Sequence, residues 1–535
     1  MDVGVLLDGP RVPAWVAWIL TEARARQTLI VTVVLVEDAA PLQRSPALFR
    51  LYESLDRRLF VTHPDALEWT DVSGIIDGAP RVQLRSQRRS EDVAELRRRD
   101  LDVFLWLGRA APPEDVFTAA RHGVWCYRHG DHRNGGPPLF WELFRAEPIS
   151  ENALESLDRE RRRVIYRSTT SIDPVSLQRN RNAVYWKSAR FAIRRLDDLA
   201  SGRWRPEQEP GERRSLSAVT DGAPTNLETL RHAAAVAGRA SRRKLQGAAF
   251  QHQWFLGFRR KPAHRLPYED PAPWRVCLPP PDRSYADPFV VADGDDTLVF
   301  LEQIVHARAR GSLAVGRLEP DGRLTDLEPL LPGGHHTSYP YVFSDAGGRF
   351  LIPEACAIRR VELFAATDFP IGWERVATLL EGVNAVDASV ILHQGLYWMW
   401  VNIAVPGGRL AEETFVYLSD RLETGWTPHP RNPVVSDARR ARPAGRPFLH
   451  EGRLIRPSQD CSGRYGARTV FNEVELLTPE EYREHPRGFL EPSWAPIPNL
   501  ATHSYTFDGQ WEATDGLRTF PRRLTSKVLR TIRSP

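Results

Sequence analysis

The sequence is poor in cysteine and methionine and has no long hydrophobic run. It contains 4 cysteines and 2 methionines among 535 residues. Because the cysteines lie far apart and form no CxxC pair, the sequence predicts neither a disulfide framework nor a zinc site, and we expect free thiols. The longest nearly apolar run, Leu29 to Val36, is much shorter than the ~20 residues that a membrane helix needs. We therefore expect no integral membrane contact.

An excess of one charge is also lacking. The 72 basic and 68 acidic residues leave a formal charge of +4. Basic runs such as Arg85 to Arg89 and Arg159 to Arg163 alternate with acids in helical patterns, which favours solvated helix faces over a nucleic-acid surface. Asp2 stands where a secretion signal carries basic residues, and no cleavage-like region follows. We expect a cytoplasmic protein that does not bind nucleic acid.

The first 170 residues alternate between strand and helix patterns. Apolar runs at 2–7, 28–36, 101–108 and 123–127 alternate with helical patterns at 13–26, 91–99 and 114–121. This alternation predicts a doubly wound, Rossmann-like α/β domain, whose binding crevice lies beyond the carboxyl ends of its strands. We expect His129, Asp131 and Arg133 to contact a ligand there. The alternative is that His129 only hydrogen-bonds loop backbone.

Residues 171–250 predict a helical connector between two domains. The helix expected at 180–199 carries an apolar stripe of Tyr185, Trp186, Phe191 and Ile193, which is typical of a core rather than of a cofactor site. Residues 201–224 are rich in Pro, Gly, Glu and Arg without a period, so we expect an exposed linker. A second helix is predicted at 226–245, and a basic tail at 526–535.

One short pattern recurs four times in the second half of the chain. Two positions 15 residues apart flank two apolar strand patterns joined by turn formers. The pairs are Asp287 and Glu302, Tyr339 and Glu354, Asp387 and Asn402, and Ala444 and Gln459. In an antiparallel hairpin, the start of the first strand and the end of the second lie at the same edge. We therefore expect these residues to gather on one rim.

The spacing of the repeats predicts the fold of this half. Repeat starts lie 52, 48 and 57 residues apart, and a period near ~50 with about four strands per unit is typical of propeller blades. Strand patterns at 254–258, 274–278, 504–507 and 510–514 predict a closing blade that combines both ends of the region. The sequence thus predicts a five-bladed β-propeller over 251–525, whose fifth pair, His503 and Asp515, is only 12 residues apart.

Carboxylates near a common axis suit glycosidic chemistry, because one must be ionised while another keeps its proton. We assign Asp287 as base, Glu354 as acid and Asp387 as the carboxylate that tunes them. The remaining polar residues of the rim form the predicted substrate-binding set: Glu302, His336, Tyr339, Asn402, Arg442, Arg456, Gln459 and Asp460. His336 lacks partners at ligand spacing and predicts no metal site, whereas the carboxylate-rich axis is a candidate calcium site.

Structural alternatives exist for several of these residues. Asp287 precedes a proline and is typical of a strand-start turn in which the carboxylate accepts backbone N–H bonds. Glu354 has Arg359 and Arg456 as candidate ion-pair partners, and Arg456 with Asp460 is a candidate tie between blades. The sequence alone leaves these alternatives open.

The run from Leu101 to Glu147 contains Asp-Val-Phe-Leu-Trp-Leu-Gly, then Arg-His-Gly-Val-Trp-Cys-Tyr-Arg-His-Gly-Asp, then Gly-Gly-Pro-Pro-Leu-Phe-Trp-Glu. It resembles the formyltransferase fold of methionyl-tRNA and sugar N-formyltransferases. The resemblance implies 10-formyltetrahydrofolate as cofactor and functional roles for His129 and Asp158. This chain carries Tyr127 where those enzymes have an asparagine.

Residues 251–523 resemble the five-bladed propellers of arabinanases, xylosidases and invertases, and more closely that of glucosamine inositolphosphorylceramide transferases. Tyr-Ala-Asp-Pro-Phe at 285–289, His-Thr-Ser-Tyr-Pro at 336–340, Ile-Pro-Glu at 352–354, Asp-Ala-Ser at 387–389 and Arg-Pro-Ser-Gln-Asp-Cys-Ser at 456–462 carry the likeness. The resemblance implies a glycan or small-molecule substrate. The propeller hydrolases place their acids in the order Asp, Asp, Glu, whereas this chain has Asp, Glu, Asp.

Three functions are compatible with these observations. The first is a carbohydrate-active protein that binds a glycosyl unit at the axial carboxylates and hydrolyses or transfers it. The second is formyl or acyl transfer to an amino sugar in the N-terminal domain. The third is a non-catalytic glycan-binding or assembly protein. The sequence does not specify the substrate or the oligomeric state.

Overall fold

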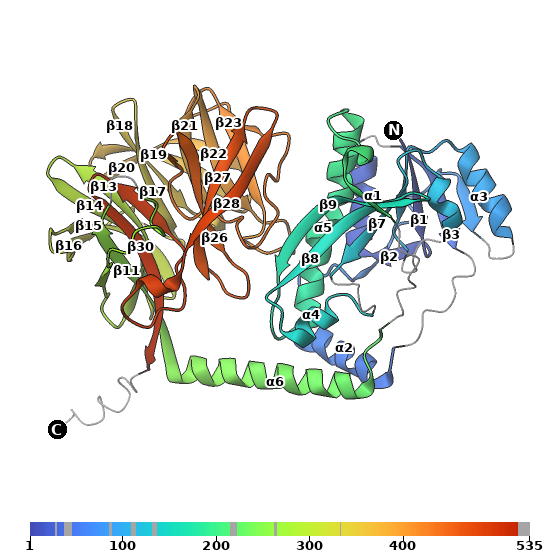
Figure 1. The fold of residues 1–535 in the computed structure, drawn as a ribbon, viewed down its shortest axis with the longest axis horizontal. Coiled ribbons are helices and arrows are strands. Elements are labelled where there is room, and N and C mark those ends of the chain that lie inside the picture. The colour runs from blue at the N-terminus through green and yellow to red at the C-terminus, as the bar shows by residue number, and fades with distance from the viewer. Residues whose placement is uncertain are drawn as a thin grey trace. The chain divides into compact units, whose positions relative to one another are not determined.

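The computed structural model describes residues 1–26, 29–36, 45–84, 88–108, 114–130, 136–213, 222–261, 265–331 and 333–522. The chain forms two compact units. The first, called the α/β unit below, comprises Met1–Arg239 together with Val405–Arg409. The second, the propeller unit, comprises Ala240–Ala404 and Leu410–Pro535 (Figure 1).

The α/β unit is built on one eight-stranded sheet with the order β10-β9-β8-β7-β6-β1-β3-β5. The strands β5, β3, β1, β6 and β7 are mutually parallel, and β8, β9 and β10 extend the sheet with antiparallel pairing. Their bounds are β1 (Asp2–Leu7), β3 (Leu29–Val36), β5 (Arg81–Leu84), β6 (Val103–Trp106), β7 (Val124–His129), β8 (Ile149–Leu157), β9 (Arg161–Ser171) and β10 (Gly211–Arg213). The order of the parallel strands is typical of a doubly wound sheet. From β1 the chain first adds β3 and β5 on one side, and then returns to add β6 and β7 on the other side.

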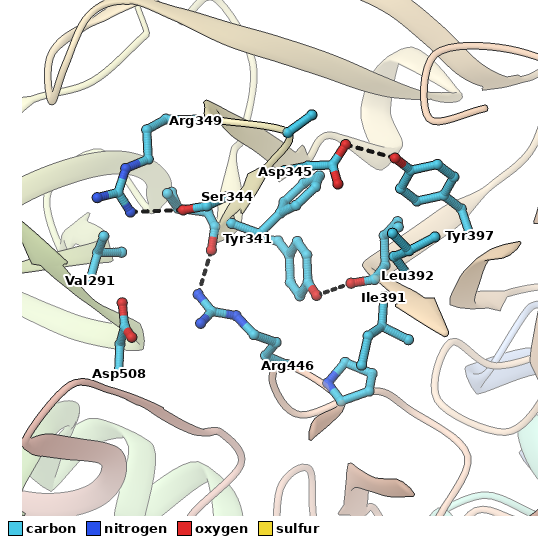
Figure 2. Close-up of a pocket in the computed structure, with 15 residues that line it drawn as sticks. Val291, Tyr341, Ser344, Asp345, Arg349, Ile391, Leu392, Tyr397, Arg446 and Asp508 are labelled. Atoms are coloured by element: carbon cyan, nitrogen blue, oxygen red, sulfur yellow. Dashed lines mark hydrogen bonds between the residues drawn. The ribbon is translucent and has the colours of Figure 1, made fainter. Parts of the chain in front are cut away.

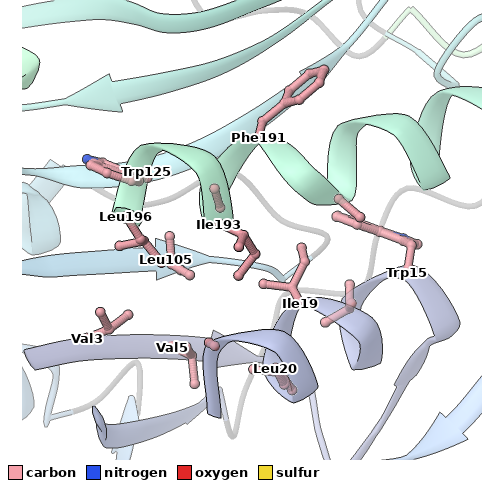
Figure 3. Packing of buried hydrophobic residues seen from close by; sticks show 14 of the residues in the cluster. Val3, Val5, Trp15, Ile19, Leu20, Leu105, Trp125, Phe191, Ile193 and Leu196 are labelled. Atoms are coloured by element: carbon pink, nitrogen blue, oxygen red, sulfur yellow. The ribbon is translucent and has the colours of Figure 1, made fainter. Parts of the chain in front are cut away.

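Alternating side chains of the buried strands enter two hydrophobic cores, one on each face of the sheet. Val3 and Val5 pack with helices α1 (Ala14–Ala25) and α5 (Leu177–Ala200), as Figure 3 shows. Leu6 packs on the other face with α3 (Arg89–Arg98) and the 3-10 helix η2 (Glu114–Thr118). Period-two alternation in the strands produces this two-sided burial. The other elements of this half are β2 (Arg11–Pro13), β4 (Trp69–Asp71), α2 (Ala47–Leu59), α4 (Phe140–Arg145), η3 (Pro206–Gln208) and α6 (Asn226–Ala249).

Some details of this half differ from the sequence-based expectations. The stripe on α5 is core, since Trp186, Phe191 and Ile193 are buried. The helix expected at 114–121 is a 3-10 helix. Residues 211–213 of the expected linker form β10, because they pair with β9 at the edge of the sheet; residues 214–221 and the basic tail lie outside the described residues. The formyltransferase resemblance stays a prediction.

The propeller unit consists of five four-stranded antiparallel sheets. Four are formed by consecutive strands, and the fifth has the order β12-β11-β30-β29, so it combines strands from both ends of the region, as predicted. The blades are β13 (Arg283–Asp293), β14 (Asp296–Val305), β15 (Arg310–Leu318) and β16 (Leu324–Pro329); β17 (Ser338–Asp345), β18 (Gly348–Glu354), β19 (Arg360–Asp368) and β20 (Gly372–Glu381); β21 (Ala385–His393), β22 (Leu396–Ile403), β23 (Thr414–Ser419) and β24 (Thr427–Pro428); β25 (Phe448–His450), β26 (Arg453–Asp460), β27 (Arg468–Leu477) and β28 (Tyr482–Leu490); and β11 (Phe250–Arg260), β12 (Arg275–Cys277), β29 (Tyr505–Asp508) and β30 (Trp511–Pro521). Short 3-10 helices lie at η4 (Cys356–Ile358) and η5 (Pro492–Trp494).

The first strands of three consecutive blades each have a β-bulge at the equivalent position near the start of the strand. The register shifts between Ala286 and Phe289 in β13, and correspondingly in β17 and β21. Within the bulges, Asp287, Tyr339 and Asp387 have φ values of 49°, 45° and 55°. Aspartate tolerates this left-handed conformation better than most residues, whereas tyrosine adopts it rarely. The bulges bend the strands and redirect these three side chains.

The closing blade contains a buried ion pair that links the two ends of the region. Arg259 on β11 pairs with Glu512 on β30, and both side chains are buried. Arg259 also donates to the carbonyl oxygens of Pro267 at 2.8 Å and Ala272 at 2.8 Å, and Tyr505 donates to Glu512 at 2.6 Å. Every partner of this pair therefore lies inside the propeller unit.

Breaking this pair is expected to destabilise the propeller unit strongly. Replacement of Arg259 by Met leaves Glu512 buried without its cation, which typically costs about 3–5 kcal/mol. Arg317 and Asp296 form an exposed pair at 2.8 Å, so Arg317→Met should cost about 1 kcal/mol or less. Urea unfolding followed by tryptophan fluorescence measures both. Equal midpoints for the two variants would contradict the structural role of Arg259.

Candidate functional site

Four buried carboxylates lie at one end of the first three blades. Strand pairing places Glu302 opposite Ala286, Glu354 opposite Ser338, and Asn402 opposite Val386. Each second-strand residue thus lies beside the bulged residue that precedes it by 15 positions. Asp287, Glu302, Glu354 and Asp387 are each at most 6% exposed, and repulsion from the other three carboxylates contributes to the raised pKa of Glu302. We call this group the axial cluster.

Asp287 is held by the closing blade. Its Oδ1 lies 2.9 Å from Nε2 of His503, whose Nδ1 lies 2.9 Å from Oδ2 of Asp515. Asp515 also accepts hydrogen bonds from the backbone N–H of His503 at 2.9 Å and from Asp287 N at 3.2 Å. Burial lowers the pKa of His503, but Asp515 and Asp287 outweigh it and raise this pKa to about 10. An imidazolium therefore bridges two carboxylates at neutral pH.

Glu302 has the opposite environment. Its Oε1 is buried and has no hydrogen-bond partner among the described residues. Burial raises the pKa of Glu302 well above its ordinary value, repulsion from Asp287 adds to the effect, and His503 opposes it. Burial and like-charge repulsion both favour the protonated form of this carboxyl group.

His336 lies between two glutamates. Its Nε2 is 3.6 Å from Glu302 Oε1 and 3.8 Å from Glu354 Oε2. Its Nδ1 accepts a hydrogen bond from Gly311 N at 2.9 Å, so the proton of the neutral ring resides on Nε2 and faces the glutamates. A Cβ on Gly311 would lie 2.0 Å from Glu302 Oε1, so only glycine leaves room for this arrangement.

Glu354 is fully hydrogen-bonded. Its Oε2 accepts from the hydroxyl of Ser338, and its Oε1 accepts from Cys356 N at 2.7 Å. Neither Arg359 nor Arg456 is its partner: Arg359 donates to Gly382 O, and Arg456 binds Glu484. Both oxygens of Glu354 are therefore already used as hydrogen-bond acceptors, in contrast to Oε1 of Glu302.

Asp387 forms the third part of the axial cluster. Arg442 donates to its two oxygens, with Nε 2.5 Å from Oδ2 and Nη2 3.3 Å from Oδ1, and Gln459 Nε2 lies 3.4 Å from Oδ2. Burial raises the pKa of Asp387 to about 6, although Arg442 acts against this. The guanidinium of Arg442 also lies 4.9 Å from the centre of the Tyr465 ring. The guanidinium of Arg442 therefore already binds a carboxylate of the protein, Asp387.

Two further residues of the predicted substrate-binding set are buried. Tyr339 N donates to Asp287 at 3.2 Å, and its hydroxyl bonds Ser389 Oγ at 2.7 Å and accepts from Gly445 N at 2.7 Å. Asn402 accepts from Ala411 N at 2.9 Å, while its Nδ2 is buried and has no acceptor among the described residues. Tyr339 therefore supports the blades, and Asn402 retains an unused donor.

Arg456 and Asp460, two residues of the predicted substrate-binding set, are ion-paired with other side chains of the protein. Arg456 is 0% exposed, and its Nε and Nη2 each lie 2.7 Å from the carboxylate of Glu484. Asp460 pairs with Arg468 at 3.0 Å and accepts from Ser462 N at 2.9 Å. Both side chains bind partners within their own blade, so the expected tie between Arg456 and Asp460 is also absent from the described contacts.

The second predicted site is not assembled as expected. His129 ends β7, and its buried ring bonds Ser188 Oγ on α5 at 2.8 Å and stacks on Tyr127. Asp158 caps the β8–β9 turn and binds Arg163. Because β8 pairs Asn152 with His129 and Leu157 with Val124, Asp158 lies beyond the opposite end of β7, roughly 20 Å away at ~3.3 Å per residue. Asp131 and Arg133 lie outside the described residues.

Sequence reasoning assigned no role to four residues next to the axial cluster. His503 and Asp515 come from the closing blade, and their 12-residue spacing was the signal that marked them as counterparts of the other pairs. Trp254 and Tyr465 flank His503 with ring centroids 4.3 Å and 5.2 Å from its own. Tyr465 is 42% exposed, so it offers an aromatic surface beside the carboxylates.

The residues of the axis do not fit calcium. Asp287, His503 and Asp515 bring three donor atoms within 4.8 Å of one another. Calcium takes six to eight oxygen ligands, and here each nitrogen of His503 already faces a carboxylate. The histidine supplies the positive charge that a metal would supply.

The described residues include no helix long and apolar enough to cross a membrane.

Part of the propeller unit matches a known family. Residues 279–491 match the family "Glucosamine inositolphosphorylceramide transferase 1, N-terminal". Proteins named Glucosamine inositolphosphorylceramide transferase 1 are 31% identical over 223 residues in Oryza sativa subsp. japonica and 33% identical over 211 residues in Arabidopsis thaliana. These alignments cover 40% and 38% of this chain, but only 30% and 27% of the plant proteins. The chain thus spans less than a third of the length of these relatives.

Solved structures give more distant similarities. An exo-β-1,3-galactanase from Clostridium thermocellum has 14% identity and a TM-score of 0.32, covering 39% of this chain and 52% of that chain. A family 117 glycoside hydrolase from Zobellia galactanivorans has 10% identity and a TM-score of 0.33, covering 53% and 98%. The assignment of the five blades rests on the strand pairing of this chain itself.

The bridging imidazolium predicts a specific pH dependence of stability. The pKa of His503 is raised from 6.5 to about 10 in the folded protein, so its contribution is complete below about 6.5 and is lost as the pH rises through about 10. The loss of stability in His503→Gln should therefore be largest near pH 6 and shrink towards pH 10. Thermal unfolding at several pH values measures this difference.

An exposed histidine provides the control for this experiment. His485 on β28 has 42% of its side chain exposed, and His485→Gln should leave the pH profile of stability close to that of the wild type. A His503→Gln deficit that stays constant between pH 6 and pH 10 would show that His503 is not charged in the folded protein.

Proposed function

We propose that the axial cluster binds a glycosyl unit and transfers it to water or to an acceptor hydroxyl. The observation that carries this proposal is the contrast between two neighbouring buried acids: Oε1 of Glu302 has no hydrogen-bond partner among the described residues, whereas Asp287 contacts His503. The pKa of Glu302 is raised by burial and by repulsion from Asp287, while Asp287 is paired with the imidazolium of His503. Glycosyl transfer requires a combination of a protonated and an ionised carboxyl group.

Each acid has a role that follows from its contacts. Glu302 would donate its proton to the oxygen of the leaving group as the glycosidic bond breaks. Asp287, held by His503, would stabilise the positive charge that develops on the sugar ring, or accept the proton of the attacking hydroxyl. The proposal moves the acid from Glu354, the sequence-based assignment, to Glu302, because both oxygens of Glu354 accept hydrogen bonds.

The surroundings of the axial cluster support a sugar as ligand. Trp254 and Tyr465 present aromatic rings beside His503, and aromatic side chains with a few fixed polar groups are typical of ligand sites. The family that matches residues 279–491 and the plant relatives are both named for a glucosamine transferase, which agrees with a carbohydrate ligand. The α/β unit has no such support for a formyl-transfer function among its described contacts.

Exchange of the two acids for amides tests the assignment. We expect Glu302→Gln and Asp287→Asn to lower kcat about 10²–10⁴-fold, the usual loss of a general acid or base, while glycosyl binding persists. Glu354→Gln should have a smaller effect. The measurement is turnover and calorimetric binding across a panel of nitrophenyl glycosides and nucleotide-activated sugars.

Glu328→Gln is the matched control, because Glu328 is an exposed acid on β16 of the same blade as Glu302. It should behave as the wild type. If the wild-type protein binds sugars of the panel without turnover, the catalytic half of the proposal is wrong and the propeller is a binding module. If it binds none of them, the whole proposal fails.

A further inference from the structure

A cavity lies at the end of the propeller opposite to the axial cluster. It has a volume of about 500 Å³, and every blade contributes to its wall. One residue from each blade defines its position: Val291 on β13, Ser344 on β17, Tyr397 on β22, Arg446 before β25, and Asp508 on β29 (Figure 2). The volume lies within the range of roughly 300–1,000 Å³ that is typical of small-molecule sites.

This cavity is separate from the axial cluster. Val291 follows Asp287 by four residues on β13, which corresponds to roughly 13 Å at ~3.3 Å per residue. Between the two levels lie the buried rings of Tyr339 and Tyr341. Tyr339 bonds Ser389 of the third blade and Gly445 next to the fourth, and Tyr341 donates to Val390 O. Buried side chains that connect three blades therefore lie between the axial cluster and this cavity.

Arg446 lines this cavity and has one nitrogen without a hydrogen-bond acceptor among the described residues. Its Nη2 donates to Val342 O at 2.6 Å, while its Nε is buried and has no acceptor among the described residues. No carboxylate of the described residues lies within ion-pair distance of its guanidinium. The same guanidinium acts on Tyr341, where burial raises the pKa of the hydroxyl to about 12 and Arg446 opposes that rise.

The other charged groups of the wall are already engaged. Arg349 donates to Ser344 Oγ at 2.8 Å and to Ala292 O at 3.1 Å. Asp508 accepts from Ala292 N and Gly509 N, each at 2.9 Å, and Asp345 accepts from the hydroxyl of Tyr397 at 2.7 Å. The guanidinium of Arg446 thus lines the cavity without a carboxylate partner among the described residues, and such a cation forms strong charge-assisted hydrogen bonds with an oxyanion.

We propose that this cavity binds a small molecule through a carboxylate or phosphate group that pairs with Arg446. The apolar part of the wall, which includes Val291, Ile391 and Pro447, would contact the rest of the ligand. The site is independent of the glycosyl function proposed for the axial cluster, because Tyr339 and Tyr341 separate the two.

Inorganic phosphate and acetate are the probes that distinguish the two oxyanions. At constant ionic strength, balanced with sodium chloride, a rise in Tm with phosphate or with acetate is the expected result. Arg446→Gln should abolish that rise, whereas Arg360→Gln should preserve it, because Arg360 is an exposed arginine on β19 that pairs with Glu381. No response to either probe, or an unchanged response in Arg446→Gln, would overturn the proposal.

A second variant gives a signal in the opposite direction. Asp508→Asn removes a negative charge from the wall and should shift the midpoint of the anion titration several-fold to lower concentration. This gain does not depend on how well the Arg446 variant folds. If Asp287→Asn rather than Arg446→Gln abolishes the response, the anion binds at the axial cluster and the cavity is not its site.

Discussion

The contact between His503 and two carboxylates is the interaction on which the axial end of the propeller depends. His503 and Asp515 belong to the closing blade, and Asp287 belongs to the first. Asp287 in turn accepts from the backbone N–H of Tyr339 in the second blade. The bulges hold Asp287 and Tyr339 in the left-handed region, a conformation that persists only where surrounding contacts enforce it. Charge pairing and backbone geometry therefore stabilise each other around the axis.

The balance of charge explains why one acid of the axial cluster retains a proton. Five carboxylates meet here, counting Asp515, while the cations paired with them are His503 and Arg442. Burying a further uncompensated charge costs several kcal/mol, so the group with the fewest partners takes up a proton. Glu302 is that group, because its Oε1 has no hydrogen-bond partner among the described residues and its pKa is raised.

Period and composition were sufficient to predict the blades and the closing sheet. The 15-residue spacing corresponds to a hairpin whose bulge and second-strand end lie side by side, as the pairing of Ala286 with Glu302 shows. Local patterns could not predict His503 as the partner of Asp287, because 216 residues separate the two and their contact arises only when the ring closes. They also misplaced Arg456, whose partner Glu484 lies on the fourth strand of its blade, where the repeats share no common spacing.

In the α/β unit, too, local sequence patterns predicted some strands but not the contacts between elements. Its buried parallel strands are apolar runs and were predictable, whereas β8 and β9 carry many polar and charged residues and acquire their strand structure from pairing. His129 was placed at a crevice because it follows an apolar run, but the ring packs against Tyr127 and α5 instead. A polar residue at a strand end faces a ligand only if the neighbouring helix leaves space for it, and helix packing is not visible in the pattern of one strand.

The second blade differs from its neighbours in a way that gives the propeller two separate ends. At the bulge station, the first and third blades carry Asp287 and Asp387, while the second carries Tyr339. An aspartate there adds charge to the axial cluster, but the longer tyrosine reaches across to the third and fourth blades and fills the axis. Because Tyr341 lies below it on the same strand, the axis is closed at this level. Tyr339, which stands where the neighbouring blades have aspartate, thus separates the carboxylates from the cavity that Arg446 lines. Each end of the propeller can then bind its own ligand.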